Sequence, residues 1–230
     1  MKKIAIIISA YNATEYILEC VTSVQNQLYA HGWEYDIRIG VDGCPDTARV
    51  LQENKIPYYY SQINVGSFTI KNSLIYKNSA DVYTYFDADD VMFENYLLQC
   101  IEQIESGHEA IIPAKYNTDK SLKIIDDSRI EDGGSMAFTH KLLDAVGGYY
   151  QFRCACDTDF MRRLVMAGFS IRRIEDPLYY RRCHSGSLTK SGLTVYGGDY
   201  RKQSWKTMCG YRKSGIIKIR PEVVDMELFE

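Results

Sequence analysis

The chain has 230 residues, of which 46% are hydrophobic and 25% charged, so it contains enough apolar side chains for the core of one large domain. No apolar run is long enough to span a bilayer, so we expect no membrane-spanning helix. The apolar run at 4–8 follows two lysines, but it is too short for a signal peptide, and we expect a buried strand there instead.

The net charge of −3 is unevenly distributed along the chain. Residues 1–159 contain 13 Lys and Arg against 23 Asp and Glu, whereas residues 160–220 contain 14 against 3. A basic region of this kind attracts polyanions such as nucleic acid, phospholipid headgroups or anionic glycans. The open alternative is a solvated surface, or a set of basic residues that holds one phosphorylated ligand.

The seven cysteines form no regular framework. An odd number cannot pair completely within one chain, and Cys154-x-Cys156 has no second pair that would complete a zinc site. We therefore expect reduced thiols in a cytosolic protein.

Strands and helices alternate through the first half of the chain. A strand is expected at 3–9, because a continuous apolar run is typical of a strand covered on both faces. Thr14 is expected to cap the next helix, which runs to about Ala30 and has an apolar stripe that ends at Leu28. Further strands are expected at 35–42, 58–61, 82–86 and 110–113, with helices at 47–53, 67–79 and 94–106. This alternation predicts an α/β fold with a mainly parallel central sheet and helices on both faces.

Beyond residue 113 the alternation breaks. We expect a hairpin or loop over 117–132, a flexible turn at 133–135, and a short helix over 140–146 that ends at Gly147-Gly148. The elements expected after these are a helix at 158–167, strands at 170–174 and 178–182, and a basic helix at 199–213. The tail 214–230 has no pattern that predicts an element.

Ligands of parallel sheets bind beyond the carboxyl ends of the strands. The expected strands end at Ser9-Ala10-Tyr11-Asn12, at Asp42 and at Asp87-Ala88-Asp89. Neither a dinucleotide-binding nor a P-loop glycine motif occurs at these ends. Two Asp side chains at positions i and i+2 of a strand end turn toward one cation, and their hard oxygens suit Mg²⁺ or Mn²⁺. We therefore expect a divalent cation at Asp87 and Asp89.

Six segments, in order over residues 3–184, together resemble the family-2 glycosyltransferases of the GT-A fold. They are Ile8-Ser9-Ala10-Tyr11-Asn12, Val41-Asp42-Gly43-Cys44-Pro45-Asp46, Asn64-Val65-Gly66 with Lys71-Asn72, Asp87-Ala88-Asp89-Asp90, Gly147-Gly148-Tyr149 and Cys156-Asp157-Thr158-Asp159-Phe160. The fourth matches the metal motif of this family without change. Three positions depart from the family pattern: Val41 stands for Asp, Lys71 for Arg and Cys156 for Glu.

The resemblance implies a donor site. Tyr11 is implied to stack on a uracil, Asp42 to accept a hydrogen bond from the base, and Lys71 to neutralise the pyrophosphate. Their ordinary alternatives are a core Tyr, a turn-forming Asp and a solvated Lys. Asp87 is implied to face the ribose or the cation, and Asp89 to bind Mn²⁺ or Mg²⁺, which acts as a Lewis acid on the leaving diphosphate. The other residues expected to contact the donor or acceptor are Ser9, Ala88, Gly134 and Ser135.

The resemblance also implies a general base, Asp157, which takes the proton of an acceptor hydroxyl as its oxygen attacks the anomeric carbon and inverts the configuration. Asp159 is assigned to structure, and Asp90 is expected to cap a helix or to lie behind the metal site. His184, in an element similar to Tyr-Arg-x-His-x-x-Ser, is implied as a further metal ligand. Cys156, in place of Glu, is expected to alter the acceptor pocket or the pKa of Asp157.

We therefore expect one GT-A (Rossmann-like) domain with a nucleotide-sugar-binding half at 1–113, an acceptor and catalytic half at 114–198, and a basic helix and tail at 199–230. The implied activity is metal-dependent, inverting transfer from a UDP-sugar to an acceptor hydroxyl in surface glycan synthesis, such as lipopolysaccharide or capsule. The acceptor is expected to be a glycan or lipid-linked glycan. The protein is expected to be cytoplasmic, with peripheral binding to the anionic inner membrane face.

Three alternatives stay open at this point. The first is a glycosyltransferase that modifies hydroxylated bases of phage DNA, in which the basic region contacts phosphates. The second is a nucleotidyltransferase, although the glycine-rich basic loop of that class is absent after the first strand. The third is a non-catalytic module that binds a nucleotide sugar. The processive Gln-x-x-Arg-Trp element is absent, which favours single transfer over polymer synthesis.

Overall fold

The computed structural model describes residues 1–126, 134–187, 189–190 and 192–230. The strands in these ranges are β1 Lys2–Ala10, β2 Trp33–Asp42, β3 Tyr58–Ser61, β4 Val82–Asp87, β5 Val91–Met92, β6 Ala110–Thr118, β7 Ile124–Asp126, β8 Ala137–Thr139, β9 Arg172–Arg182 and β10 Glu227–Phe229. The helices are α1 Ile17–Gln25, α2 Pro45–Glu53, α3 Ser67–Lys77, α4 Tyr96–Glu105, α5 His140–Val146, α6 Cys156–Met166 and α7 Asp199–Lys213, with a 3₁₀ turn at Gly192–Thr194. None of the described helices is long and apolar enough to cross a membrane.

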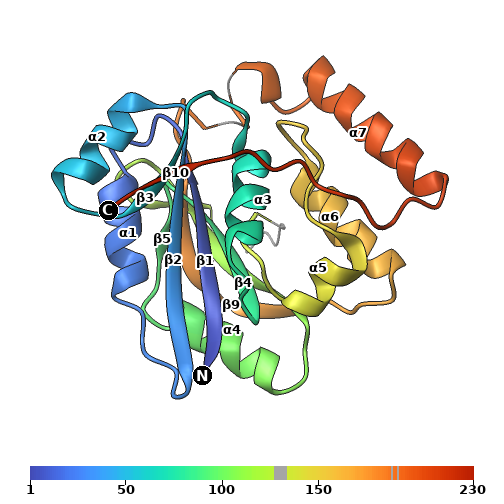
Figure 1. Cartoon of the computed structure of the whole chain (residues 1–230), viewed down its shortest axis with the longest axis horizontal. Coiled ribbons are helices and arrows are strands. Elements are labelled where there is room, and N and C mark those ends of the chain that lie inside the picture. Colours follow the sequence, from blue (N-terminus) through green and yellow to red (C-terminus); the bar gives the residue numbers. More distant parts are fainter. Residues whose placement is uncertain (127–133, 188, 191) are drawn as a thin grey trace.

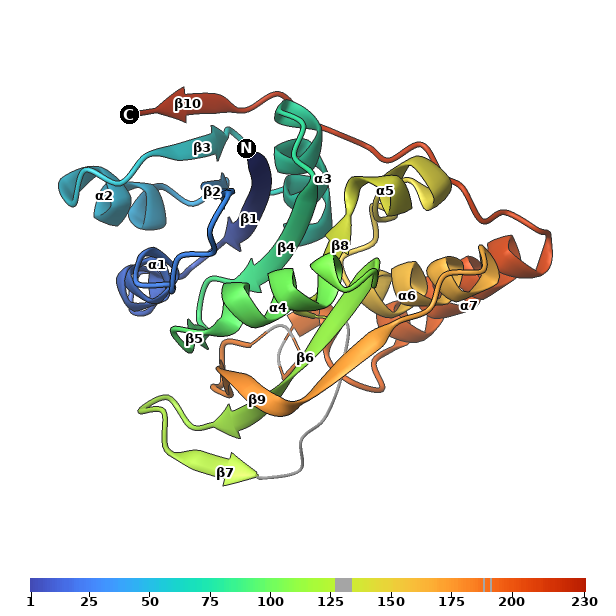
Figure 2. The ribbon, with the colours of Figure 1, turned by 90° about the horizontal axis from the view of Figure 1, so that it is seen from below.

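Within the described residues, ten strands form one sheet in the order β10-β3-β2-β1-β4-β8-β6-β9-β5, with β7 paired to β6 (Figures 1 and 2). β3, β2, β1 and β4 run parallel to one another, as do β6 and β9. β8 lies antiparallel between β4 and β6 and joins these two parallel parts. The predicted α/β fold with a parallel centre is confirmed, and the short strands β5, β7, β8 and β10, which pair antiparallel, make the complete sheet mixed.

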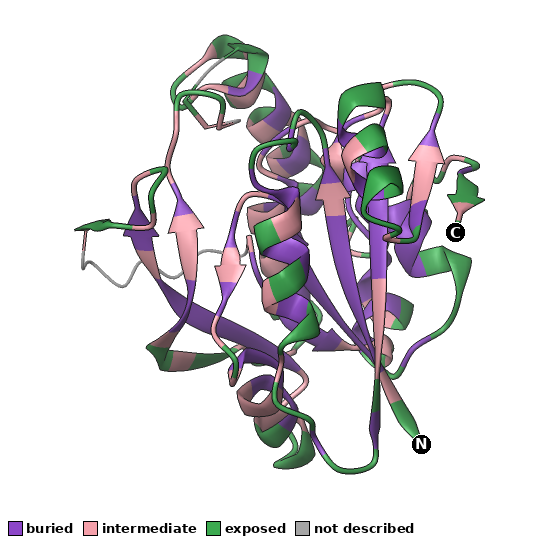
Figure 3. Cartoon of the chain, turned by 90° about the vertical axis from the view of Figure 1, so that its left-hand side faces the viewer, coloured by how far each residue is buried: buried purple, intermediate pink, exposed green. Residues whose placement is uncertain are grey.

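The side chains of β1 alternate between two separate cores. Ile4, Ile6 and Ile8 pack with α1, α2 and α4 in one core, whereas Ala5 and Ile7 pack with α3, α5 and α6 in the other. Helices therefore cover both faces of the sheet, as Figure 2 shows and as the continuous apolar sequence predicted. Each fully buried isoleucine stabilises the fold by about 1.5–3 kcal/mol. Figure 3 shows that the buried residues follow the central strands along most of their length.

Helix α1 is shorter than predicted at both ends. It begins after Tyr16, which contributes no side-chain cap, so the prediction that Thr14 caps this helix is wrong. The helix ends at Gln25 because the segment that follows packs against the loop before α4. There the Leu28 amide donates to the Glu94 carbonyl at 2.7 Å. Leu28 is consequently 43% exposed instead of lying on the buried stripe.

The strands predicted at 170–174 and 178–182 are two parts of one strand, β9. Its register against β6 shifts after Pro113. Pro113 pairs with Ile174 and the next residue, Ala114, pairs with Pro177, so Glu175 and Asp176 have no partner in β6. These two residues form a bulge, which bends the strand without ending it. The bulge carries the second part of β9, up to Arg182, alongside the end of β6.

The excursion predicted over 117–132 begins as a hairpin of β6 and β7. At its tip, Asp119 Oδ1 accepts the backbone N–H groups of Ser121 at 2.8 Å and Lys123 at 3.0 Å, which closes a side-chain-to-backbone turn. Residues 127–133, which include Gly133 of the predicted turn, lie outside the described residues.

The C-terminal tail crosses from α7 to the far edge of the sheet, where β10 pairs antiparallel with β3 (Figure 1). On the way, the Ile219 amide donates to the Val146 carbonyl in α5, and the Val224 amide donates to Ser73 Oγ in α3. Gly147 has a φ of +72°, and a Cβ atom there would lie 2.0 Å from the Ile219 carbonyl oxygen. Only glycine lets the tail pass this close to α5.

A buried ion-pair network joins α6, α7 and the segment after α5. Arg163 has no exposed surface, and its Nε donates to Asp159 Oδ2 at 2.7 Å while Nη1 and Nη2 donate to the carbonyls of Val146 and Gly148, both at 2.6 Å. Arg212 in α7 binds the other carboxylate oxygen of Asp159. Burial lowers the pKa of Arg163 to about 10, so its guanidinium stays charged at neutral pH. Asp159 therefore has a structural role.

Arg163→Met should lower the free energy of unfolding by about 3–5 kcal/mol, because it leaves buried carbonyl groups and one side of the Asp159 carboxylate without their cation. Urea unfolding followed by circular dichroism measures this change. Lys206→Met, at an exposed position of α7, is the matched control and should change the free energy by less than about 0.5 kcal/mol. A loss below about 1 kcal/mol for Arg163→Met would contradict the structural importance of the network.

Candidate active site

A cavity of about 1170 Å³ opens at the carboxyl ends of β1, β2 and β4. These strands are parallel, so their polar C-terminal residues meet at one edge of the sheet. The sequence-predicted residues that line the cavity are Ser9, Tyr11, Asp42, Lys71, Asp87, Ala88, Asp89, Gly134, Asp157 and His184. Tyr11 is 51% exposed, so its ring is accessible from the cavity.

Ser135 is the predicted donor residue that the cavity lining does not include. It is 3% exposed, and its Oγ donates to the Tyr85 carbonyl at 2.9 Å and lies 3.4 Å from the Tyr96 hydroxyl. These bonds tie β4 to the segment before β8. The structure thus gives Ser135 a supporting position beneath the cavity, away from its surface.

Asp42 fixes the loop that precedes α3. Its Oδ1 accepts the Val65 amide at 2.7 Å and its Oδ2 accepts the Gly66 amide at 2.9 Å. Burial raises the pKa of Asp42 above its ordinary value, although the two N–H donors act in the opposite direction. Gly43, which follows, has a φ of +62° and turns the chain sharply enough for these contacts to form.

Lys71 and Asp87 form an ion pair across the cavity floor. The ammonium lies 3.0 Å from Asp87 Oδ1, and the Lys71 side chain is 5% exposed against 49% for Asp87. The ammonium also lies 5.6 Å from the ring centres of Phe68 and Tyr85. Lys71 is therefore held on α3 beneath the carboxylate, where its charge is available to a group that contacts Asp87.

Asp89 and His184 form a second polar pair in the cavity. His184 Nε2 lies 2.9 Å from Asp89 Oδ2, and the two side chains are 19% and 27% exposed. Adjacent ligands of an octahedral Mg²⁺ with bonds of about 2.1 Å are about 3 Å apart, so the two atoms fit neighbouring positions on one cation. Among the described residues no group of three His, Cys, Asp or Glu side chains is arranged for a metal. Oxygen atoms of a bound ligand would have to complete the coordination.

Asp90 lies behind this pair. It is 5% exposed, and its Oδ1 accepts the Arg182 amide at 2.9 Å. Burial, together with the neighbouring carboxylates of Asp89 and Asp87, raises its pKa well above the ordinary value. Of the two expected roles, helix capping is wrong, because the residue before α4 is Asn95. Asp90 lies behind Asp89, and its role in supporting a cation there stays a prediction.

Asp157 lies in the first turn of α6 and lines the cavity, half-buried. The helix begins one residue before it, after Ala155 in the left-handed conformation, rather than at the predicted residue 158. Cys156 points the other way, into the core shared by α3, α5 and α6, and its thiol donates to the Phe152 carbonyl at 3.3 Å. Burial raises the pKa of this thiol, so it stays protonated.

Arg153 and Arg182 also line the cavity, and the motif search missed both. Arg153 donates to the side-chain and backbone oxygens of Asn64. Arg182 contacts three separate segments of the chain. The available signal for Arg182 was the basic composition after residue 160, which the sequence left open between a polyanion-binding region, a solvated surface and a set of residues that holds one phosphorylated ligand. Three of those basic side chains, Arg163, Arg182 and Arg212, are buried instead.

A family model and two named relatives match the sequence. The family model described as "Glycosyl transferase family 2" matches residues 5–167. Glycosyltransferase GlyG of Streptococcus pneumoniae serotype 4 is 26% identical over 125 residues, which are 51% of this chain and 40% of that protein. Teichoic acid poly(glycerol phosphate) polymerase of Staphylococcus epidermidis is 24% identical over 174 residues, which are 73% of this chain and 23% of that protein. This chain thus spans less than half the length of these two relatives.

Solved structures share the fold. The structure of S. aureus TarS 1-349 in complex with UDP-GlcNAc superimposes with a TM-score of 0.66 and 16% identity, and the match covers 84% of this chain and 61% of that one. Mannosyltransferase PcManGT from Pyrobaculum calidifontis, in complex with GDP-Man and Mn²⁺, gives a TM-score of 0.62 and 16% identity over 77% of this chain and 56% of that one. The predicted GT-A fold is confirmed.

Gly43→Ala should disrupt the Asp42 loop, because a Cβ atom at this positive φ would lie 2.5 Å from the Asn64 backbone nitrogen. We expect a loss of about 1–3 kcal/mol in the free energy of unfolding. Amide hydrogen exchange at Val65 and Gly66 should also become faster. The control is Gly210→Ala in α7, where no atom lies within 4 Å of the added Cβ and a gain of up to about 1 kcal/mol is expected. Unchanged exchange at Val65 and Gly66 would refute the coupling between Gly43 and the loop.

Proposed function

Since this chain belongs to glycosyl transferase family 2, we propose that it transfers a sugar from a nucleotide-sugar donor to an acceptor hydroxyl. The observation that carries the proposal is the meeting of the Lys71–Asp87 pair, the Asp89–His184 pair and Asp157 in one cavity at the carboxyl edge of the sheet. Such a cavity offers a cation site, a charge for a diphosphate and a proton acceptor. A nucleotidyltransferase or a non-catalytic module needs no carboxylate in the position of Asp157.

The donor is proposed to be a UDP-sugar. Tyr11 presents an accessible ring for stacking on a base, and Asp42 and Ser9 lie beside it in the cavity lining. Asp42 already binds two amides, so a hydrogen bond to the base would use a second lone pair of one of its oxygens. TarS, a protein of the same fold, has been solved with UDP-GlcNAc, which supports a uridine nucleotide.

The cation is proposed to bind at Asp89 and His184, with Asp87 close by. A bound Mn²⁺ or Mg²⁺ supplies a Lewis acid that stabilises the negative charge of the leaving diphosphate. The Lys71 ammonium pairs with the Asp87 carboxylate and offsets part of its negative charge. This pairing reduces the repulsion between the carboxylates of the cavity and a bound diphosphate. The Mn²⁺ complex of PcManGT supports this choice of metal.

Asp157 is proposed as the general base. Its carboxylate accepts the proton of the acceptor hydroxyl while the oxygen of that hydroxyl forms a bond to the anomeric carbon. The bond from the anomeric carbon to the diphosphate oxygen breaks, and its electron pair leaves with the nucleotide. A single displacement of this kind inverts the anomeric configuration. Because Cys156 points into the core, it leaves the cavity side of α6 to Asp157.

The acceptor is proposed to be an anionic surface glycan. Arg153 and Arg201 line the cavity and donate to neutral oxygens, on Asn64 and Thr194, so these contacts do not neutralise their charges. A relative named teichoic acid poly(glycerol phosphate) polymerase supports an acceptor that carries phosphate. Membrane binding stays a prediction. The DNA alternative is less favoured, because Arg163, Arg182 and Arg212 of the basic region are buried.

The first test is UDP release from a panel of UDP-sugars, with Mn²⁺ or EDTA, and with or without poly(glycerol phosphate) as acceptor. One donor should give UDP release that EDTA abolishes and that Asp89→Ala lowers by about a hundredfold or more. Asp225→Ala, which removes an exposed carboxylate of the tail, should leave the rate unchanged. No UDP release from any donor, together with no Mn²⁺-dependent UDP binding, would contradict the proposed function.

Asp157→Asn should lower the turnover rate by about 10²–10⁴-fold, because the amide has the shape of the carboxylate but cannot accept the proton. The Kd for UDP with Mn²⁺, measured by calorimetry, should stay within about twofold of the wild type, since donor binding does not use this group. The control is Asp144→Asn, an exposed carboxylate on α5. A variant that keeps full turnover would remove Asp157 from the mechanism.

A further inference from the structure

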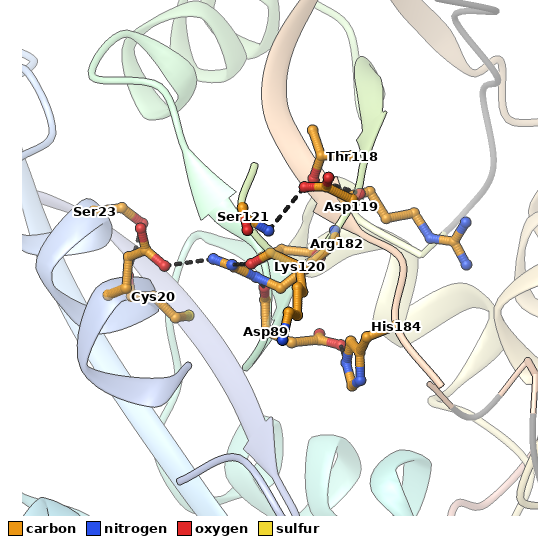
Figure 4. Close-up of polar contacts among 12 residues, drawn as sticks. Cys20, Ser23, Asp89, Thr118, Asp119, Lys120, Ser121, Arg182 and His184 are labelled. Carbon is orange, nitrogen blue, oxygen red and sulfur yellow. Dashed lines mark hydrogen bonds and ion pairs between the residues drawn. The ribbon is translucent and has the colours of Figure 1, made fainter. Parts of the chain in front are cut away.

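Arg182, at the end of β9, binds three other parts of the chain through its guanidinium (Figure 4). Its Nε donates to the Asp89 carbonyl at 2.8 Å. Its Nη1 donates to the Lys120 carbonyl at the tip of the β6–β7 hairpin, and its Nη2 binds Glu19 Oε2 of α1. The side chain is 4% exposed, so these contacts replace nearly all of its hydration.

The contacts of Arg182 reach both proposed cation ligands. Its guanidinium holds the backbone of Asp89, and its own amide donates to the Asp90 carboxylate at 2.9 Å. Its guanidinium carbon also lies 4.6 Å from the ring centre of Tyr16, and the His184 ring packs against that same ring, at 5.0 Å between ring centres. Arg182 therefore holds the backbone of Asp89 directly and reaches His184 through the Tyr16 ring.

The same guanidinium fixes one wall of the cavity. Asp119 and Lys120 line the cavity from the hairpin tip, where the Asp119 carboxylate closes the turn. The bond from Arg182 Nη1 to the Lys120 carbonyl attaches this tip to the Asp89 loop. The position of the wall and the position of the cation ligands therefore depend on the same side chain.

Only arginine can make this set of contacts. The three acceptors lie around one planar group, and each takes a hydrogen bond from a different nitrogen. A lysine ammonium keeps the charge but cannot reach three separate segments at once. Glu19 is 49% exposed and provides the negative charge that makes burial of the guanidinium tolerable.

We propose that Arg182, with Glu19 as its counterion, is the positioning residue of the cation site, holding Asp89 and His184 in place and attaching the hairpin tip to them. The proposal rests on the proposed function, because it assigns Asp89 and His184 to a divalent cation. Residues that orient metal ligands from behind alter metal affinity by about 10–100-fold when they are replaced. Arg182 is expected to act in this way while never touching the donor.

The test measures Mn²⁺ binding directly, by titration calorimetry in the presence of saturating UDP, on the full chain. Arg182→Lys should raise the Kd of Mn²⁺ by about tenfold or more, and Glu19→Gln should raise it by a smaller factor in the same direction. The matched control is Arg172→Lys, an exposed position on the same strand, which should leave the Kd unchanged. The KM for Mn²⁺ should rise with the Kd, and saturating Mn²⁺ should restore most of kcat.

A second readout does not depend on the metal. Amide hydrogen exchange of residues 119–123 should become faster in Arg182→Lys, because the hairpin tip loses its bond to the guanidinium. Circular dichroism establishes that each variant is folded at the temperature used. If Arg182→Lys does not fold, Glu19→Gln, which removes the counterion and keeps the arginine with its carbonyl contacts, decides the positioning role by the Mn²⁺ titration.

The outcomes separate this inference from the function on which it rests. Wild-type protein that binds no Mn²⁺ with UDP would overturn the proposed function itself. Wild-type binding that Arg182→Lys leaves within twofold, with or without a lower melting temperature, would overturn the positioning role and leave the function intact. Unchanged exchange at 119–123 would overturn the attachment of the hairpin.

Discussion

A strand that is buried on both faces can offer a ligand only its ends, and this constraint organises the whole molecule. The alternate side chains of β1 are divided between two cores, so no part of its length is left for chemistry. β2 and β4 flank it in parallel, and the same edge therefore receives Ser9, Asp42 and Asp87. The hydrophobic effect that holds the sheet together also decides where polar groups can gather, since the carboxyl edge is where the chain leaves the core.

Much of this arrangement could be predicted from the sequence because it depends on local patterns. The apolar runs fix the parallel strands, and the acids that follow them mark the cavity, as Asp87 and Asp89 do. His184 was found by its place in a motif, and the structure sets it 2.9 Å from Asp89 although 95 positions separate them. Asp159 was assigned to structure, and it pairs with Arg163 and Arg212 inside the molecule.

The features that escaped prediction depend on contacts between distant segments. Helix α1 ends early because Leu28 bonds to Glu94, which no periodicity reveals. Ser135 lies one residue beyond Gly134, yet its hydroxyl is used by the Tyr85 carbonyl instead of a ligand. The basic composition after residue 160 gave no sign that Arg182 would be buried, because its acceptors come from α1, the Asp89 loop and the hairpin tip. A count of the Lys and Arg residues at 160–220 takes no account of burial, so it overestimates how many of these charges lie on the surface.

The pairing of β10 with β3 has a consequence for the order in which the molecule is assembled. β3 lies at residues 58–61, and its outer edge stays unpaired until residues 227–229 have been made. During synthesis residues 1–113 can form their parallel strands early, but they carry an exposed edge for the whole time that residues 114–226 are being made. The bond between the Ile219 amide and the Val146 carbonyl also requires α5 to be in place first. Residues 227–229 therefore cover this edge only after α5 has formed, and a nascent chain in which they have not yet been made presents β3 to neighbouring copies on the same messenger RNA.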